Sequence, residues 1–271
     1  MRARIWGCRG SLATPGEATA AYGGNTSCVE VRTRSGRLIV LDAGTGVRPL
    51  GLTVEDDEID VLLTHMHLDH VEGLGFFAPL FRPGRRIRFW GPRPGELSLA
   101  EQVGLYLSPP FFPVPFERFD AAVEFNEVWE DAWSLDGVAV TTAPLEHPGP
   151  TLGYRLEEDG ASLAYIPDNE LGRNPDAGAS IAAGADVLLH DAQYTREEYD
   201  ARVGWGHSAI DDFAAYVGRV RPRRTLMFHH DPAHGSAELD AMLAAARDGA
   251  GGLPIELGTE GTVIDVEPSL D

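Results

Sequence analysis

The sequence predicts a layered α/β fold, formed by residues 1–271 as one domain. Its first third holds short apolar runs separated by glycine-rich turns, a pattern typical of β-strands. Its last part alternates apolar strands with segments of helical spacing, which favours helices packed in layers on sheets. Hydrophobic residues make up 43% of the chain, a share that is ordinary for a globular enzyme and excludes a disordered one.

Strands are expected first at residues 2–7, 28–33, 37–44 and 59–65, each ended by a turn. The runs RLIVL and VLLT are apolar almost throughout, which suits interior strands covered on both faces. Residues 76–119 differ, because they combine prolines with large aromatic residues, which argues against long helices and central strands. Linkers are poor in aromatics, so this segment is predicted to be a packed lid or connection. Part of it, 104–119, is left with three roles: covering substrate, contacting a second copy, or packing in the core.

Strands return after residue 123, at 137–145, 151–158 and 161–168. Residues 175–192 are expected to form a helix that leads into a buried strand, and strands follow at 224–230 and 261–267. A helix is predicted at 209–220 with Ser208 as its cap, and another at 236–249. Helical spacing gives the first of these one apolar stripe, made of Ile210, Phe213, Ala214, Val217 and Val220.

The charge balance limits the partners. The net charge is −20 and arginine supplies every one of the 22 basic residues, so strong binding of long nucleic acid, which depends on many cationic contacts, is disfavoured. No window holds the roughly 18 to 20 apolar residues of a membrane span, and residues 1–11 do not resemble an export signal. Cys8 and Cys28 are too few for a disulfide framework, and a cytoplasmic location is expected.

The segment THMHLDH, residues 64–70, is the strongest chemical signal. If the preceding strand ends near Thr64, His65 and His67 alternate to the same side of an extended segment. Asp69 and His70 then follow in the turn, close enough to serve a second ion. Imidazoles and carboxylates suit zinc and similar divalent metals, so a metal site is favoured over a solvated polar loop.

Further candidate ligands stand where later strands end. They are His147, Asp168 and either His229 or His230. Taken alone, each histidine can be a hydrogen-bonded structural residue, and Asp168 can stabilise a turn. Taken together, they are what a metal centre along one sheet edge requires.

These motifs resemble the metallo-β-lactamase-fold hydrolase superfamily, through the H-x-H-x-D-H loop and the later His, Asp and His. The segments GCRGSLATPG, GGNTSC, LDAGTG and GHSAI are similar to its ribonuclease Z-like branch, which includes cyclic phosphodiesterases. The resemblance extends over nearly the whole chain. It implies a four-layer αββα sandwich that holds two divalent metal ions, zinc by default, with manganese or iron as alternatives.

The resemblance also assigns ligands to each ion. One ion would be held by His65, His67 and His147. The other would be held by Asp69, His70 and a C-terminal histidine, with Asp168 bridging the two. The context LMFHHDP favours His229 over His230 for the last place.

Outside the ligands, His207 in GWGHSAI resembles the histidine of the branch's H-S-T motif, which contacts the scissile phosphate, although Ala209 replaces the threonine. The resemblance further implies that Asp191 orients His207. Asp42 in LDAGTG is expected to steady the ligand loop.

The sequence therefore predicts a phosphodiesterase for a small diester, cyclic diesters included. A metal-bound hydroxide is expected to attack phosphorus beside Asp69, while His207 stabilises or protonates the leaving oxygen. Two alternatives remain: a metal-dependent hydrolase of lactones, thioesters or β-lactams, and a non-catalytic metal-binding or sensing module. A homodimer is left open.

Overall fold

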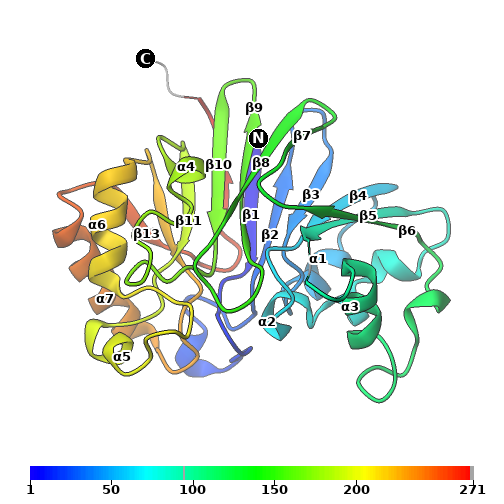
Figure 1. Ribbon diagram of the computed structural model, residues 1–271, viewed down its shortest axis with the longest axis horizontal. Helices are drawn as coiled ribbons and strands as arrows, with labels where there is room; N and C mark the ends of the chain where they lie inside the picture. The colour runs from blue at the N-terminus through cyan, green and yellow to red at the C-terminus, as the bar shows by residue number, and fades with distance from the viewer. Residues whose placement is uncertain (94, 269–271) are drawn as a thin grey trace.

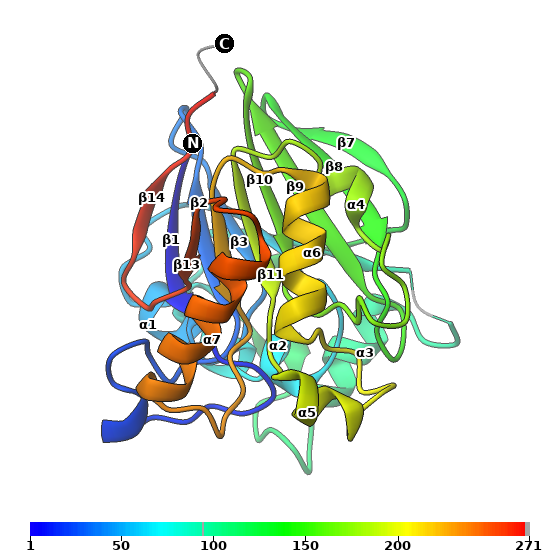
Figure 2. The ribbon, with the colours of Figure 1, turned by 90° about the vertical axis from the view of Figure 1, so that its left-hand side faces the viewer.

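The computed structural model describes residues 1–93 and 95–268, and within them the strands form two seven-stranded sheets. The sheets pack face to face, with helices on both outer sides (Figures 1 and 2). Figure 2 shows α6 and α7 side by side on the outer face of one sheet, whereas α1, α2 and α3 flank the other. The predicted αββα sandwich is confirmed.

The chain order of the elements differs from their order in space. The first sheet runs β14 (Val263–Asp265), β1 (Arg2–Gly7), β2 (Cys28–Arg32), β3 (Leu38–Leu41), β4 (Glu58–Leu62), β5 (Arg86–Pro92) and β6 (Ala122–Val128). The second runs β13 (Ile255–Leu257), β12 (Thr225–Phe228), β11 (Val187–Asp191), β10 (Ala161–Ile166), β9 (Leu152–Glu158), β8 (Val138–Pro144) and β7 (Ala132–Leu135). The α-helices are α1 (Val47–Gly51), α2 (Leu68–Val71), α3 (Leu99–Tyr106), α4 (Ala179–Ala182), α5 (Arg196–Asp200), α6 (Ile210–Val220) and α7 (Ser236–Gly249). Short 3-10 helices are η1 (Glu17–Thr19), η2 (Leu74–Phe76), η3 (Ala78–Phe81) and η4 (Phe116–Arg118).

The central core lies between the sheets, where side chains from both inner faces interlock, among them Ile5, Leu163, Tyr165 and Phe228. The outer faces have cores of their own. The predicted stripe of α6 is buried there from Ile210 to Val220, as its helical spacing requires. None of the helices in the described part of the chain is long and apolar enough to cross a membrane.

Three local predictions need correction. Residues 86–92 form β5, an interior strand paired with β4 and β6, although the segment 76–119 was expected to lack central strands. Its prolines stand only at or beyond the strand ends, so RIRFW can pair on both sides. Ser208 does not cap α6, because its hydroxyl donates to the carbonyl of Asn169 and Ala209 takes the cap position. The helix expected in 175–192 is the single turn α4.

Within the predicted lid, α3 and η4 pack on the outer side of the first sheet. Phe112, Phe116 and Phe119 lie against its core, which favours packing as a role for much of 104–119. Leu105 and Phe111 stay exposed.

The sheet topology gathers the candidate site at one edge. β3, β4, β5 and β6 are parallel neighbours, and so are β10, β11 and β12, so their carboxyl ends meet there. Figure 1 shows α2, which carries Asp69 and His70, at the lower edge of the sandwich.

Candidate metal centre

The ligand loop owes its shape to the change from strand to helix. β4 ends at Leu62, and His67, in extended conformation, is the N-cap of the one-turn helix α2. His65 and His67 therefore lie before the helix, whereas Asp69 and His70 lie within it. This change of backbone direction divides the four side chains between two clusters.

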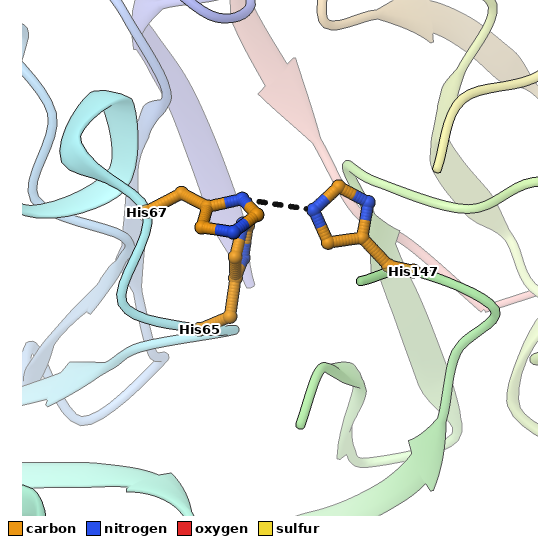
Figure 3. A group of neighbouring side chains, drawn as sticks. All are labelled: His65, His67 and His147. Atoms are coloured by element: carbon orange, nitrogen blue, oxygen red, sulfur yellow. Dashed lines mark hydrogen bonds between the residues drawn. The ribbon is translucent and has the colours of Figure 1, made fainter. Parts of the chain in front are cut away.

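The first cluster consists of His65, His67 and His147, whose ring nitrogens lie within 4.8 Å of one another. The three rings converge from two separate segments, with Nδ1 of His67 2.9 Å from Nε2 of His147 (Figure 3). Burial lowers the pKa of all three, that of His147 to about 4. The rings are thus held neutral near pH 7, the form that binds metals.

The second cluster consists of Asp69, His70, Asp168 and His229, all buried and likewise within 4.8 Å. Oδ2 of Asp69 lies 3.0 Å from Nε2 of His229 and 3.3 Å from Nε2 of His70. Burial would raise the pKa of Asp69, but the imidazoles of His70 and His229 hold it well below its usual range. This carboxylate is therefore ionised and able to serve as a ligand.

Asp168 connects the two clusters. Its Oδ1 lies 3.1 Å from Nε2 of His70 and 3.3 Å from Nε2 of His229. Its Oδ2 lies 3.8 Å from Nε2 of His65 and 3.7 Å from Nε2 of His147. One carboxylate oxygen thus faces each cluster, the position expected of a bridging group.

The hydrogen bonds around the rings test whether cations fit. Nδ1 of His70 donates to Asp42, Nδ1 of His147 to the Gly206 carbonyl, and Nδ1 of His229 to Gln193, over 2.8 to 2.9 Å. Each outward bond leaves the Nε2 lone pair facing the centre, the usual arrangement of metal-ligating histidines.

Two further observations also indicate that cations fit the two clusters. Nε2 of His65 is buried and has no hydrogen-bond partner within residues 1–93 and 95–268. Burial lowers the pKa of His70, but the carboxylates of Asp168 and Asp69 outweigh it and raise the pKa well above its ordinary value. The second cluster thus favours positive charge, and the residues present fit divalent cations.

The two adjacent histidines that follow β12 point in different directions and have different partners. His229, with a φ of 58°, turns into the second cluster, while Nε2 of His230 donates to the Gly258 carbonyl over 2.8 Å. A side chain at Gly10 would collide with the His229 ring, which explains the glycine in GCRG. The geometry favours His229 over His230 as the last ligand.

His207 lies at the rim of both clusters. Its ring stacks on that of His229 with centroids 4.9 Å apart and lies 5.3 Å from that of His147. Nδ1 donates to Oδ2 of Asp191 over 3.0 Å, which fixes the tautomer. Burial lowers the pKa of His207, but Asp191 outweighs it and the pKa is raised.

Asp42 lies under the ligand loop, buried and with a φ of 57°. Besides the bond from His70, its carboxylate accepts the Thr64 N–H over 2.8 Å and the Tyr165 hydroxyl over 2.9 Å. It therefore fixes the start of the loop and the orientation of one ring.

Sequence reasoning missed three supporting groups. Gln193 orients His229, and the Ser11 N–H donates to Asp69 over 2.7 Å. The third is Glu170, fully buried, whose carboxylate accepts the N–H groups of Gly204 (2.7 Å) and Gly206 (2.8 Å) and the Tyr199 hydroxyl (3.0 Å). The polar run PDNE after β10 was the available signal for Glu170.

The Glu170 contacts fix a loop that serves the metal centre. Gly206, with a φ of 89°, holds Nδ1 of His147 through its carbonyl and precedes His207 directly. A side chain at Gly206 would collide with the His147 ring. Glu170 thereby positions both histidines without touching either.

A hollow opens over the first cluster. It has a volume of about 180 Å³ and is lined by His65, Met66, His67, Pro92, Gln102, Pro148, Gly149 and Pro150.

Comparison with known proteins agrees with this geometry. A sequence profile described as "Beta-lactamase superfamily domain" matches residues 37–230. The ribonuclease Z of Mycolicibacterium paratuberculosis is 30% identical over 244 residues, which cover 80% of this chain and 81% of that protein.

Solved structures share the fold. A diphosphatase of the PhnP family superposes with a TM-score of 0.73 at 21% identity, covering 100% of this chain and 99% of its own. Zn(2+)-bound PqqB from Methylobacterium extorquens superposes with a TM-score of 0.67 at 18% identity, covering 98% and 100%. With the profile spanning more than half of its length, the chain belongs to the β-lactamase superfamily, as a hydrolase of the ribonuclease Z-like branch of the metallo-β-lactamase fold.

Proposed function

We propose that this hydrolase uses two metal ions to cleave a small phosphodiester. The observation that carries the proposal is Asp168, with one oxygen facing each cluster and the His207 ring at their rim. The relative is named a ribonuclease and one structural neighbour a diphosphatase, and both names refer to cleavage at phosphorus.

The proposed ligands are those expected from the sequence. His65, His67 and His147 would hold one ion, Asp69, His70 and His229 would hold the other, and Asp168 would be shared between them. Zinc is the first candidate, because imidazole and carboxylate suit it and the PqqB neighbour is zinc-bound. Divalent cations bound here lower the pKa of a water and neutralise charge on the phosphoryl oxygens.

Two side chains complete the chemistry. His207, with Nδ1–H donated to Asp191, presents Nε2 to hold a proton and deliver it to the leaving oxygen. Asp69 keeps its negative charge within the second cluster, held in place by the Ser11 N–H, and so orients what binds there.

The substrate is proposed to be small. The hollow over the first cluster accommodates a phosphoryl group with short substituents, and a net charge of −20 opposes a long polyanion. The cytoplasmic location and the homodimer stay predictions.

The proposal is tested with protein depleted of metal and reconstituted with zinc or manganese. We expect turnover of bis-p-nitrophenyl phosphate and of cyclic nucleotides only in the reconstituted protein, measured beside a lactone, a thioester and a β-lactam.

Other outcomes would contradict it. Faster turnover of a carbonyl substrate would assign the other hydrolase class, and no turnover at full metal occupancy would indicate a sensing module. Tight, salt-sensitive binding of tRNA would overturn the small substrate.

A further inference from the structure

A second hollow adjoins the metal centre on the side of α3. Its volume is about 580 Å³, and its lining consists of Met66, Leu68, Val71, Leu97, Gln102, Leu105, Tyr106 and Phe111. None of these eight described residues is charged, although 24% of the chain is. A groove without cations offers nothing to a second phosphate and suits an apolar ligand.

The groove borders the hollow over the first cluster. Met66 and Gln102 line both, and Met66 stands between His65 and His67 in the ligand loop. A molecule with its phosphorus at the metal centre can therefore extend along α3, past Met66 and Gln102, without meeting a charged side chain of the groove.

Folding explains Val71, which is buried in the core of the first sheet, but not the exposed apolar residues of this groove. In α3, Leu99 and Val103 are buried in the core of the first sheet, while Leu105 is 58% exposed. Leu68 is 63% exposed and Phe111 is 77% exposed. Single exposed apolar residues are common, but a contiguous set beside an active site indicates a binding surface.

The position of His207 decides which part of a diester reaches the groove. His207 lines neither hollow, so the oxygen that it protonates lies on another side of the metal centre. If His207 protonates the leaving oxygen as proposed, the leaving group would point toward His207, and the ester group that stays on phosphorus would point toward Met66.

We propose that the groove binds the retained ester group of the substrate, and that this group is an uncharged aryl or alkyl substituent. The proposal rests on the phosphodiesterase function proposed above and narrows its substrate class to diesters with one apolar ester.

The test uses zinc-loaded protein and diesters that share the p-nitrophenolate leaving group but differ in the retained ester. We expect kcat/KM for phenyl p-nitrophenyl phosphate to exceed that for methyl p-nitrophenyl phosphate by about tenfold or more. Leu105→Gln should abolish this preference by lowering kcat/KM for the phenyl diester to about that for the methyl diester. Leu52→Gln is the matched control, since Leu52 is 61% exposed after α1 and outside the groove, and it should keep the preference.

A binding measurement separates this inference from the proposed function. Diphenyl phosphate should bind the zinc-loaded protein more tightly than dimethyl phosphate by calorimetry, and Leu105→Gln should remove the difference. If no diester turns over but this difference in binding is found, the phosphodiesterase function is wrong, whereas the binding of an apolar ester group in the groove is supported. Equal binding of the phenyl and methyl compounds, together with equal kcat/KM, would overturn the proposal that the groove binds the retained ester group. A loss of dimer in Leu105→Gln with unchanged ester preference would also overturn it and assign the surface to a second copy.

Discussion

Buried carboxylates occur at two places in the sandwich, Asp60 within β4 and Asp69 with Asp168 at the metal centre. Their negative charges are balanced in different ways. Asp60, fully buried in β4, accepts from Nε of Arg37 over 2.7 Å and from Nε1 of Trp90 over 2.9 Å. Nε of Arg88 lies 3.0 Å from Oδ1, the oxygen that accepts from Trp90. This carboxylate is matched by fixed cations and donors from neighbouring strands.

Asp69 and Asp168, at the metal centre, face imidazoles instead of arginines. Those rings donate their outer N–H groups elsewhere and present lone pairs inward, and Nε2 of His65 has no partner in the described residues. The charge of Asp60 is balanced within the protein, whereas the metal centre would be complete only with cations bound. A buried carboxylate thus indicates function when its surroundings lack the matching charge.

The largest effect is expected from Asp168→Asn, which removes the negative charge shared by the clusters. Several kcal/mol of transition-state stabilisation depend on correctly held ions, so kcat/KM should fall about a thousandfold or more. Mass spectrometry should show fewer bound ions while circular dichroism stays unchanged. Full metal content with full activity would contradict the bridging role.

His207→Ala should lower kcat/KM about a hundredfold with the metal content unchanged, because a general acid is lost. The loss should be larger for a diester with an alkyl leaving group than for bis-p-nitrophenyl phosphate, since p-nitrophenolate leaves without a proton. An equal loss for both leaving groups would assign His207 to binding alone.

Glu170→Gln should lower kcat/KM about tenfold, because the loop that holds His147 and His207 loses its anionic anchor. Zinc affinity, followed by competition with a chelator, should fall with it. Glu158→Gln is the matched control: Glu158 is also buried and accepts a backbone N–H, that of Arg34, but lies away from the site. Equal losses in both variants would mean that Glu170 acts only on stability.

Asp60→Asn should have the smallest effect on turnover and a clear effect on stability. Removing one partner of a buried ion pair costs about 3 kcal/mol of unfolding free energy, measured by urea denaturation. The activity of the folded, metal-loaded protein should stay within about twofold of the unmodified chain. A large loss of activity would show that Asp60 and the metal centre are coupled through β4.

Local signals in the sequence were sufficient to predict that residues 64–70 follow a strand and that α6 is a helix with one buried face. Strand alternation and helical spacing act over a few residues, so both can be read from a short segment. The αββα layering and the pairing of His207 with Asp191 came from the resemblance. The role of Glu170 could not be predicted, because its partners Gly204 and Gly206 are distant in sequence and meet it only in the folded chain. The strand β5 was missed because proline content was weighed over the whole segment and not by position.

The origin of the ligands from both sheets has a mechanical consequence. His65, His67, Asp69 and His70 follow a strand of the first sheet, whereas His147, Asp168 and His229 follow strands of the second. Ions bound as proposed would therefore join the two sheets at this edge, in addition to hydrogen bonds such as those from the Tyr165 hydroxyl to Asp42 and from the Tyr154 hydroxyl to the Leu63 carbonyl. With the proposed ions bound, the free energy of ion binding would add to the free energy of unfolding, so metal supply would affect the stability of the folded chain as well as its activity.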